Sequence, residues 1–550
     1  GTHGGELWAL DPANITGLSS GSGSGSSSTS AFAYANNKMD AGYHHTCAIL
    51  DNGDLKCWGR GGSGQLGDGT QMHANVNTPP STAIDLGTGR TAVAISAGGH
   101  HTCAILDDGS LKCWGQDSSG QLGDGGSNTN TDAPSSTAID LGTGRTAVAV
   151  SAGTGHTCAI LDNGDLKCWG QDTYYQLGDG GGGSSGTNTN APSSTAIDLG
   201  TGRTAVAVSA GNRHTCAILD NGDLKCWGAN SLGQLGDGST SIKTAPSSTA
   251  IDLGTGRTAV AVVAENYYTC AVLDNGEAKC WGYDGFGQLG DGGSNTDTNA
   301  PSSTAIDLGT GRTAVAVSAG NGHTCAILDN GEAKCWGYDS NGQLGDGGSN
   351  TNTNAPSSTA IALGSGRTAV ALSAGSAFTC AILDNGDMKC WGTDYYGQLG
   401  NGGTTAEQGS PVAVSGSDTW DSTTIASSIS GSGSGGGMTN VTSAISCVAT
   451  PSLPAGLNID SSTCTISGTP TAEAVNATYE INATISGVTY IGSVWLSAAP
   501  FGTITSAVEG AALNLGEAMT PITLNYTSQA PSGSTIYGNG SVWDLSSYTV

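Results

Sequence analysis

Charged residues are scarce in this 550-residue sequence, and basic ones are the scarcest. Asp, Glu, Lys and Arg make up 11% of the residues, with 45 acidic against 17 basic side chains and a net charge of −28. An electrostatic field of that sign repels phosphate backbones and anionic lipid. We therefore expect neither nucleic acid nor a membrane surface among the partners.

Long apolar runs and helical periodicity are also missing. No stretch of 18 or more apolar residues occurs, so the sequence predicts no membrane insertion, and no useful length repeats apolar residues at helical spacing. Glycine accounts for 90 residues, which is typical of short strands joined by tight turns. At this length we expect two or more domains, all of them β-structured.

Motifs of the common catalytic centres are absent. The sequence has no Gly-x-Ser-x-Gly, His-Glu-x-x-His, phosphate-binding loop or dinucleotide fingerprint. Its carboxylates lie in repeated turns such as Asp-Asn-Gly-Asp, whereas a catalytic pair should interrupt a repeat. We therefore predict that the protein is not an enzyme.

Cysteine, in contrast, is abundant and regularly spaced. Of the 16 cysteines, 14 form seven pairs with nine residues between partners. Zinc knuckles have roughly two to four intervening residues, so nine argues against zinc. Disulfides need an oxidising compartment, which predicts an extracellular or cell-surface protein. The predicted disulfides are Cys47–Cys57, Cys103–Cys113, Cys158–Cys168, Cys216–Cys226, Cys270–Cys280, Cys325–Cys335 and Cys380–Cys390.

The first pair shows which strand register the cysteines require. Two short apolar runs flank Asp51-Asn52-Gly53, a strong hairpin signal. A two-residue turn would place Cys47 opposite Trp58 and the two cysteines on opposite faces. A three-residue loop with Gly53 in the left-handed bulge position places Cys47 opposite Cys57, and only this register allows a disulfide.

The hairpin recurs seven times at intervals of 54 to 58 residues, a period typical of propellers and solenoids. The copies read His-Thr-Cys-Ala-Ile-Leu-Asp-Asn-Gly-Asp-Leu-Lys-Cys-Trp-Gly, or a close variant, and continue into Gly-Gln-Leu-Gly-Asp-Gly. These motifs resemble the RCC1 repeat in a cysteine-paired, secreted form, over about residues 31–416. The resemblance implies a seven-bladed β-propeller of four-stranded blades. We expect residues 31–42 to complete the blade begun by the seventh hairpin.

Gly/Ser-rich tracts separate this propeller from its flanks. Residues 1–30 should form an N-terminal strand and tether, residues 417–498 a linker and an Ig-like β-sandwich, and residues 499–550 a further β module. The Ig-like assignment rests on Leu-Pro-Ala-Gly-Leu and Ile-Ser-Gly-Thr-Pro, which resemble modules of large microbial surface proteins. That resemblance implies an eighth disulfide, Cys447–Cys464.

Two side chains recur blade by blade and are better explained by packing than by chemistry. A histidine precedes Thr-Cys in five copies, but Tyr268 and Phe378 hold the equivalent positions and cannot replace a neutral imidazole ligand. An arginine in Gly-Arg-Thr, such as Arg90, should bond carbonyls or carboxylates of a neighbouring blade. Both are predicted to be structural.

The segment after each Cys-Trp-Gly varies most, and equivalent segments should lie on one rim of the ring. Exposed aromatic side chains on variable loops over a rigid scaffold make binding surfaces, although such side chains could also merely cap the blade ends. The candidate binding rim comprises Tyr174, Tyr175, Tyr283, Phe286, Tyr338, Tyr395 and Tyr396.

One loop alternates oxygen-bearing side chains at Asp124, Asn128, Asn130 and Asp132, and similar runs occur at 291–299 and 346–354. Hard cations take oxygen ligands, so Ca²⁺ is the one cofactor that the sequence suggests. The run lacks a bidentate glutamate, however, and Asn/Thr/Gly loops are also ordinary turn material.

Glycosylation sequons all lie outside the propeller repeats. They occur at Asn14, Asn440, Asn476, Asn482, Asn525 and Asn539. We expect glycans at these sites if the host adds them.

Two functions fit these features. The first is an extracellular structural or interaction protein of a microbial cell surface, a homo-oligomer or polymer that assembles into a filament or array through terminal β-strands. The alternative is a secreted, monomeric recognition module whose aromatic rim binds a protein or a surface glycan, because the fold alone does not choose a function.

Overall fold

The structure, a computed structural model, describes residues 38–70, 75–181, 186–348, 350–404, 407–416 and 418–420, together with the later strands named below. The chain divides into two compact units, one of which extends over Ala33–Val441. Within the described ranges no helix is long and apolar enough to cross a membrane.

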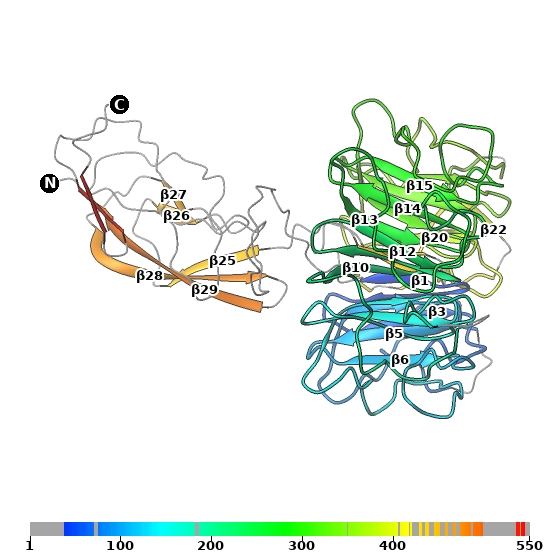
Figure 1. Cartoon of the computed structure of the whole chain (residues 1–550), viewed down its shortest axis with the longest axis horizontal. Helices are drawn as coiled ribbons and strands as arrows, with labels where there is room; N and C mark the ends of the chain where they lie inside the picture. Colours follow the sequence, from blue (N-terminus) through cyan, green and yellow to red (C-terminus); the bar gives the residue numbers. More distant parts are fainter. Residues whose placement is uncertain are drawn as a thin grey trace. The chain divides into compact units, whose positions relative to one another are not determined.

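The Ala33–Val441 unit contains seven blades, numbered here in chain order. Figure 1 shows strands of these blades, coloured from blue through green to yellow along the chain. Each blade consists of an inner strand, which reads Ala-Val-Ala-Val-Ser-Ala or similar in blades two to seven, followed by the two strands of the cysteine hairpin. The inner strands are almost completely buried, and their small alanines allow neighbouring inner strands to approach one another.

The strands of the first four blades are β1 (Met39–Ala41), β2 (His45–Ile49), β3 (Leu55–Gly59), β4 (Ala92–Ala97), β5 (His101–Leu106), β6 (Leu111–Gly115), β7 (Ala147–Ala152), β8 (His156–Leu161), β9 (Leu166–Gly170), β10 (Ala205–Ala210), β11 (His214–Leu219) and β12 (Leu224–Gly228). Those of the last three are β13 (Ala259–Ala264), β14 (Tyr268–Leu273), β15 (Ala278–Gly282), β16 (Ala314–Ala319), β17 (His323–Leu328), β18 (Ala333–Gly337), β19 (Ala369–Ala374), β20 (Phe378–Leu383), β21 (Met388–Thr393) and β22 (Glu407–Ala413).

Among the described residues, the fourth strand of a blade is complete only in the seventh, where β22 pairs with β21. In the other six blades a single bridge holds the fourth position, such as Gly115 with Thr131. The Asn/Thr/Gly-rich loops there favour turns over a continuous strand. Blades one to six are therefore three-stranded with a one-residue fourth contact, whereas the resemblance implied four strands in every blade.

The hairpin register is the one that the three-residue loop predicts. Cys47 pairs with Cys57 in β2 and β3, and the backbone N–H of Leu50 donates to the carbonyl of Asp54 at 2.8 Å. Gly53 has a φ of 84°, in the left-handed region that glycine adopts without strain.

All seven cysteine pairs of the propeller form disulfides. Their Cα atoms lie 4.0–4.1 Å apart, because each pair sits directly opposite in an antiparallel hairpin. Seven disulfides agree with an oxidising compartment. Residue 464 lies outside the described residues, and the predicted eighth disulfide with it.

Each blade is bonded to the preceding one by the same two side chains. The Trp114 indole N–H and the Thr102 hydroxyl both donate to the Gln65 carbonyl of the first blade, at 3.1 and 2.8 Å. All seven blades repeat this contact, and Trp58 makes it to Gln398 of the seventh blade. The ring is therefore closed.

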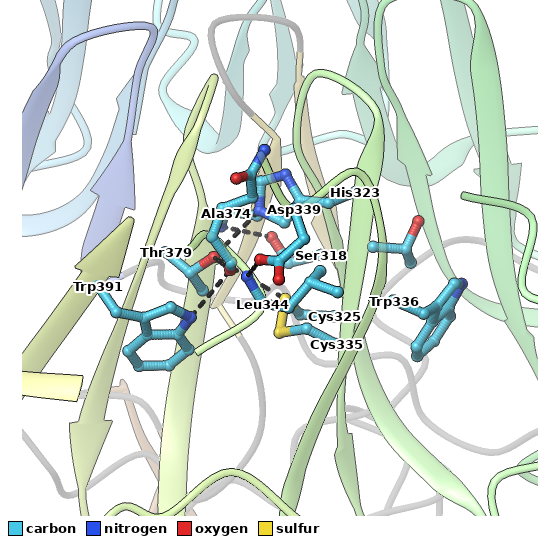
Figure 2. The surroundings of a disulfide bond; sticks show 12 residues. Ser318, His323, Cys325, Cys335, Trp336, Asp339, Leu344, Ala374, Thr379 and Trp391 are labelled. Atoms are coloured by element: carbon cyan, nitrogen blue, oxygen red, sulfur yellow. Dashed lines mark hydrogen bonds between the residues drawn. A yellow bond between two sulfur atoms is a disulfide. The ribbon is translucent and has the colours of Figure 1, made fainter. Parts of the chain in front are cut away.

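Figure 2 shows one of these junctions, between the sixth and seventh blades. Trp391 and Thr379 of the seventh blade lie beside the Cys325–Cys335 disulfide of the sixth. The disulfide thus belongs to the buried core between blades rather than to their surface.

The ring closes differently from the sequence prediction. Strand β1 pairs with β2 in the first blade and does not complete the seventh, which has its own inner strand β19 and outer strand β22. The prediction was wrong because a short turn joins each inner strand to the hairpin that follows it, so those two pair, whereas the long segment after the third strand crosses to the next blade.

The segment after β22 covers the junction between the last and first blades. Trp420 forms a bridge to Leu50 and its ring centroid lies 5.4 Å from that of Trp58. Asp418 accepts two hydrogen bonds from the Lys56 ammonium, at 2.8 and 2.9 Å. At five other junctions the equivalent lysine donates to a leucine carbonyl instead.

Beyond the blades, β23 (Ser428–Gly431) and β24 (Gly435–Met438) form a hairpin beside the inner strands β10, β13 and β19. The other unit contains an antiparallel sheet in the order β25 (Ile445–Thr450), β28 (Ala474–Ile485), β29 (Val488–Ala498). It also contains the hairpins β26 (Leu457–Ile459) with β27 (Ile466–Gly468) and β30 (Thr535–Gly538) with β31 (Ser541–Asp544). This all-β arrangement agrees with the predicted Ig-like module.

Candidate binding rim

The turns before the second strands and the segments after the third strands lie at the same end of the propeller. The backbone N–H of Arg60 donates to the carbonyl of His44 at 2.8 Å, and the equivalent bond occurs in every blade. Each blade therefore holds one variable turn beside one variable segment. We call this end of the propeller the rim face.

Aromatic and basic side chains form a continuous row on the rim face from the third blade to the fifth. The Arg213 guanidinium lies 4.5 Å from the ring centroid of Tyr174 and 5.8 Å from that of Tyr267. Tyr267 in turn lies 6.5 Å from Tyr283, in an edge-to-face arrangement. Such cation–π and aromatic pairs hold large side chains in place without covering them.

The row continues into the sixth blade. Phe286 contacts Tyr283 edge-to-face at 5.9 Å and Tyr338 at 4.7 Å. Gly322, with a φ of 100°, makes room for Phe286, because a Cβ atom there would lie 2.9 Å from the phenylalanine ring. We call Tyr174, Arg213, Tyr267, Tyr283, Phe286 and Tyr338 the tyrosine patch.

A pocket of about 280 Å³ opens within the tyrosine patch. It is lined by Leu232, Asn266, Tyr267, Tyr268, Tyr283, Phe286, Gln288, Asn321 and Gly322. Asn266 accepts a hydrogen bond from the Asn212 amide and donates one to Asn321, at 2.5 and 3.1 Å. The pocket therefore combines an apolar wall with amide groups at its edge, as binding pockets commonly do.

A second group of side chains lies on the rim face where the ring closes. His44 lies 4.9 Å from the Tyr396 ring, and the Arg60 guanidinium lies 5.3 Å from it. Tyr43 contacts His100 edge-to-face at 5.6 Å. Burial, with help from the Arg60 charge, lowers the pKa of both histidines to about 4, so they are neutral at physiological pH.

Six of the seven predicted rim residues fall into three groups. Tyr174, Tyr283, Phe286 and Tyr338 come together in the tyrosine patch. Tyr396 belongs to the group at the ring closure, and Tyr395 is 55% exposed without joining either group.

Tyr175 was wrongly predicted to be an exposed residue of the binding rim. It is 4% exposed and has a φ of 61°, because it holds the tight-turn position where other blades have a glycine such as Gly120. Its side chain is therefore buried beneath the rim face and is not part of a binding surface. Sequence reasoning also missed Arg213 and Tyr267, although the turns that carry them vary between blades.

The five repeated histidines are structural, as predicted. Each is fully buried, and its Nε2 lies 2.8–3.0 Å from the threonine hydroxyl of the next blade. Burial lowers their pKa values to about 3. In the fifth blade the Tyr268 hydroxyl makes the interblade contact instead, donating to the His323 carbonyl at 2.6 Å.

The repeated arginines pair within their own blade rather than with a neighbouring one. Arg90 lies 3.2 Å from Asp107 in the hairpin turn that follows it, and Arg145, Arg203, Arg257, Arg312 and Arg367 form the equivalent pairs. The prediction of an interblade partner was wrong because the short inner strand returns the arginine to the turn of its own hairpin.

A set of buried aspartates lies under the segments after the third strands. Asp117 is fully buried; its Oδ1 accepts the backbone N–H of Leu122 at 2.9 Å. Its Oδ2 has no hydrogen-bond partner among the described residues. Burial, reinforced by the nearby Asp124 carboxylate, raises the pKa of Asp117 to about 6.

The predicted calcium ligands have different neighbours in the structure. The Asn130 amide oxygen accepts the backbone N–H of Asp117 at 3.0 Å, whereas Asn128 is exposed with a φ of 53°. The Asp132 carbonyl accepts a hydrogen bond from Gly69 in the first blade. No group of three or more His, Cys, Asp or Glu side chains in the described ranges could hold one metal ion.

The predicted glycosylation sites cannot be placed as side chains. Asn476 and Asn482 lie in β28, of which only the strand pairing is described. The other four, Asn14, Asn440, Asn525 and Asn539, lie outside the described residues.

Comparison with known proteins identifies the repeats and the tail. Residues 88–439 match the family model described as RCC1-like domain, and residues 37–65 and 52–105 match the Regulator of chromosome condensation (RCC1) repeat. Residues 401–493 match a model described as "Putative Ig domain".

Individual relatives cover the propeller. The ultraviolet-B receptor UVR8 of Arabidopsis thaliana is 28% identical over 372 residues, which are 66% of this chain and 78% of that protein. The human E3 ubiquitin-protein ligase HERC2 is 28% identical over 303 residues, which are 55% of this chain but 6% of that protein. The crystal structure of Prp20p from Saccharomyces cerevisiae matches with a TM-score of 0.57 at 18% identity, over 73% of this chain and 93% of that one, and shows the shared fold alone.

Proposed function

Because the chain belongs to the RCC1-like domain family, we propose that its propeller is a non-catalytic recognition module whose rim face binds a protein. Prp20p is described by its binding properties to Gsp1p and histones, and a protein partner is the corresponding expectation here. The buried disulfides and interblade hydrogen bonds make the scaffold rigid, so a surface on it is preorganised for binding.

The tyrosine patch is the observation that carries this proposal. Its side chains are partly exposed and come from four successive blades, although aromatic residues make up only 5% of the sequence. Tyr and Arg are the residue types that dominate binding energy at protein interfaces. The patch therefore has the composition of an interface centre rather than of an ordinary surface.

The pocket in the patch favours a protein segment as the occupant. Its volume of about 280 Å³ matches one large side chain, and the amides of Asn266 and Asn321 lie at its edge to bond the backbone of the same segment. The row of aromatic side chains extends past the pocket over neighbouring blades, which surrounds a single anchor with further aromatic contacts. That combination is typical of protein–protein contacts.

A displayed library of random peptides, selected on the full chain, tests this proposal. We expect enriched peptides to share a large apolar residue and to lose at least ten-fold in affinity for the Tyr283→Ala and Phe286→Ala variants. Arg312→Ala, at the opposite end of the sixth blade, serves as the matched control and should bind normally. Binding that is insensitive to both patch substitutions, or selective binding to a glycan array with no peptide enriched, would reject the proposal.

We also propose an extracellular location, supported by the seven disulfides. Assembly into a filament through terminal strands concerns residues 1–30 and 499–550, most of which lie outside the described residues, so it stays a prediction. Light scattering of the purified full chain tests it: particles larger than one chain at micromolar concentration would support assembly, and a monodisperse monomer would exclude it.

A further inference from the structure

In the fourth blade an asparagine replaces the buried aspartate under the rim face, and its hydrogen bonds show which atoms surround this position. Asn230 stands there in place of the aspartate, and its Oδ1 accepts the backbone N–H of Leu235 at 3.0 Å. Its amide nitrogen donates to Oδ1 of Asp237 at 3.2 Å and to the carbonyl and hydroxyl oxygens of Ser239 at 3.0 and 3.3 Å. The position of that nitrogen is therefore surrounded by oxygen atoms.

Five other blades have an aspartate in the place of Asn230. In three of these the leucine N–H is the only donor to the aspartate among the described residues. Asp117, Asp284 and Asp339 use Oδ1 as Asn230 does, accepting the N–H of the leucine five residues later at 2.9 Å. This shared contact orients the side chain in the same way, so Oδ2 lies where Asn230 has its nitrogen (Asp339 and Leu344 in Figure 2). All three Oδ2 atoms are buried without a hydrogen-bond partner in the described part of the chain.

A second carboxylate lies opposite each of these oxygens. Asp124, Asp291 and Asp346 hold the place of Asp237, and each accepts the N–H of the glycine two residues on at 2.7 Å, as Asp237 accepts that of Ser239 at 2.9 Å. Asp124, Asp291 and Asp346 are exposed residues, and the carboxylate of each repels the buried carboxylate beside it unless a positive charge lies between them. In the fourth blade this repulsion does not arise, because the Asn230 amide donates a hydrogen bond to Asp237.

We propose that the pairs Asp117–Asp124, Asp284–Asp291 and Asp339–Asp346 each bind one Ca²⁺ ion between their carboxylates. Ca²⁺ takes six to eight oxygen ligands from carboxylates, carbonyls, amide side chains and water. Two carboxylates balance its charge. Gly126, Gly293 and Gly348 stand where the fourth blade has Ser239, so water and other neutral oxygens complete the ligand set. The sequence pointed to this loop but missed the buried aspartate.

Two of the remaining blades also have the buried aspartate, and Oδ2 of Asp172 and of Asp394 has no hydrogen-bond partner in the described ranges. The seventh blade pairs Asp394 with Asn401, so it has one carboxylate fewer and is left out of the proposal. In the third blade the backbone N–H of Thr187 reaches Asp172, and we leave that pair out as well. The first blade has Gly61 in the aspartate position and no pair.

An ion at these sites would act between blades. The loop that carries Asp124 donates from Gly125 to the Asn190 carbonyl of the next blade at 2.8 Å, and Gly292 and Gly347 make the equivalent bonds. Holding the loop against the buried aspartate therefore also holds this outer contact. We expect calcium to stabilise the ring rather than to take part in a reaction.

Calcium titration of the full chain tests the proposal. Wild type should bind Ca²⁺ saturably at pH 7.4 and show a higher melting temperature in millimolar Ca²⁺ than in EDTA. The variant Asp117→Asn/Asp284→Asn/Asp339→Asn converts the three pairs to the arrangement that Asn230 already tolerates, so it should fold, lose the three ions and lose the calcium-dependent shift. Asn230→Asp should add one ion.

A matched variant separates coordination from net charge. Asp85→Asn/Asp140→Asn/Asp252→Asn removes the same number of charges from exposed turn positions and should keep wild-type binding. Wild type without saturable Ca²⁺ binding would overturn the proposal and leave protonation as what neutralises the pairs. Unchanged binding in the Asp117→Asn/Asp284→Asn/Asp339→Asn variant would overturn it equally, and neither result depends on the peptide-binding rim.

Discussion

Replacing Asp40 by serine should remove a pH-dependent loss of stability. Asp40 lies fully buried in β1, where its Oδ2 accepts the backbone N–H of Ala97 in the next blade at 2.7 Å. The equivalent acceptor in the second blade is Ser96, whose hydroxyl accepts the N–H of Ala152 at 2.9 Å. A serine at position 40 can therefore make the same interblade contact without carrying a charge.

The sign of the effect follows from the shift in the pKa of Asp40. Burial raises this pKa from 3.8 to about 7 in the folded protein, although hydrogen bonds from Ala97 and Ser373 oppose the change. Between those values the folded protein retains a proton that the unfolded chain has released. The free energy of unfolding therefore falls as pH rises from about 4 to about 7 and does not fall further above that range.

The magnitude can be bounded from the same values. At about 1.4 kcal/mol per pH unit, the interval between the two pKa values corresponds to roughly 4 kcal/mol for a fully buried group. The free energy of unfolding of wild type, relative to that of Asp40→Ser, should fall by up to about 4 kcal/mol between pH 4 and pH 8.

Urea unfolding at a series of pH values under non-reducing conditions measures this difference directly. Ser151→Ala removes an equivalent interblade acceptor, that of the Ala210 N–H, and Ser151 is not among the groups that shift the pKa of Asp40, so its difference from wild type should not vary with pH. A wild-type minus Asp40→Ser difference that stays within about 0.5 kcal/mol from pH 4 to pH 8 would refute the reasoning.

Three further substitutions test the ring and its rim. Asp418→Ala leaves the buried Lys56 ammonium without its carboxylate at the ring closure and should cost about 1–2 kcal/mol of stability in urea unfolding; an equal stability for Asp418→Ala and wild type would contradict the assigned role. Replacing Cys325 and Cys335 by alanine opens one buried disulfide and should cost roughly 2–3 kcal/mol in the same measurement, so an unchanged unfolding midpoint would argue against it. Gly322→Ala puts a Cβ atom against the phenylalanine of the pocket. Because the preformed site is lost, a selected peptide should bind at least about five-fold more weakly. Titration calorimetry measures this affinity, and an undiminished value would show that the pocket is not the anchor.

The locally encoded features were predictable from the sequence. The nine-residue cysteine spacing with Asp51-Asn52-Gly53 between two short apolar runs predicts one hairpin register, and β2 and β3 have that register. The histidine before each Thr-Cys was correctly assigned to packing because Tyr268 and Phe378 substitute for it. The first inference involves residues of one hairpin, and the second compares equivalent positions in copies of the repeat.

The wrong or missing inferences concern residues from different blades or different turns. Tyr175 was read as exposed because its neighbours are variable, but the tight-turn position buries it. Tyr267 was missed because it lies before its blade's hairpin, whereas Phe286 lies after it, and only the folded blade puts both beside the pocket. Asp117 was missed because its partner Asp124 lies on the far side of a turn.

The spacing of cysteine and glycine alone determined the disulfides, the strand registers and the number of blades, because a hairpin closes through contacts that are local in the chain. Only the tertiary structure decided which inner strand joins which hairpin, how Trp420 and Asp418 cover the closure, and which side chains meet on the rim. These outcomes depend on contacts between segments about one repeat apart, or between the first and last segments of the propeller sequence. The order of residues along the chain does not specify which of these segments become neighbours.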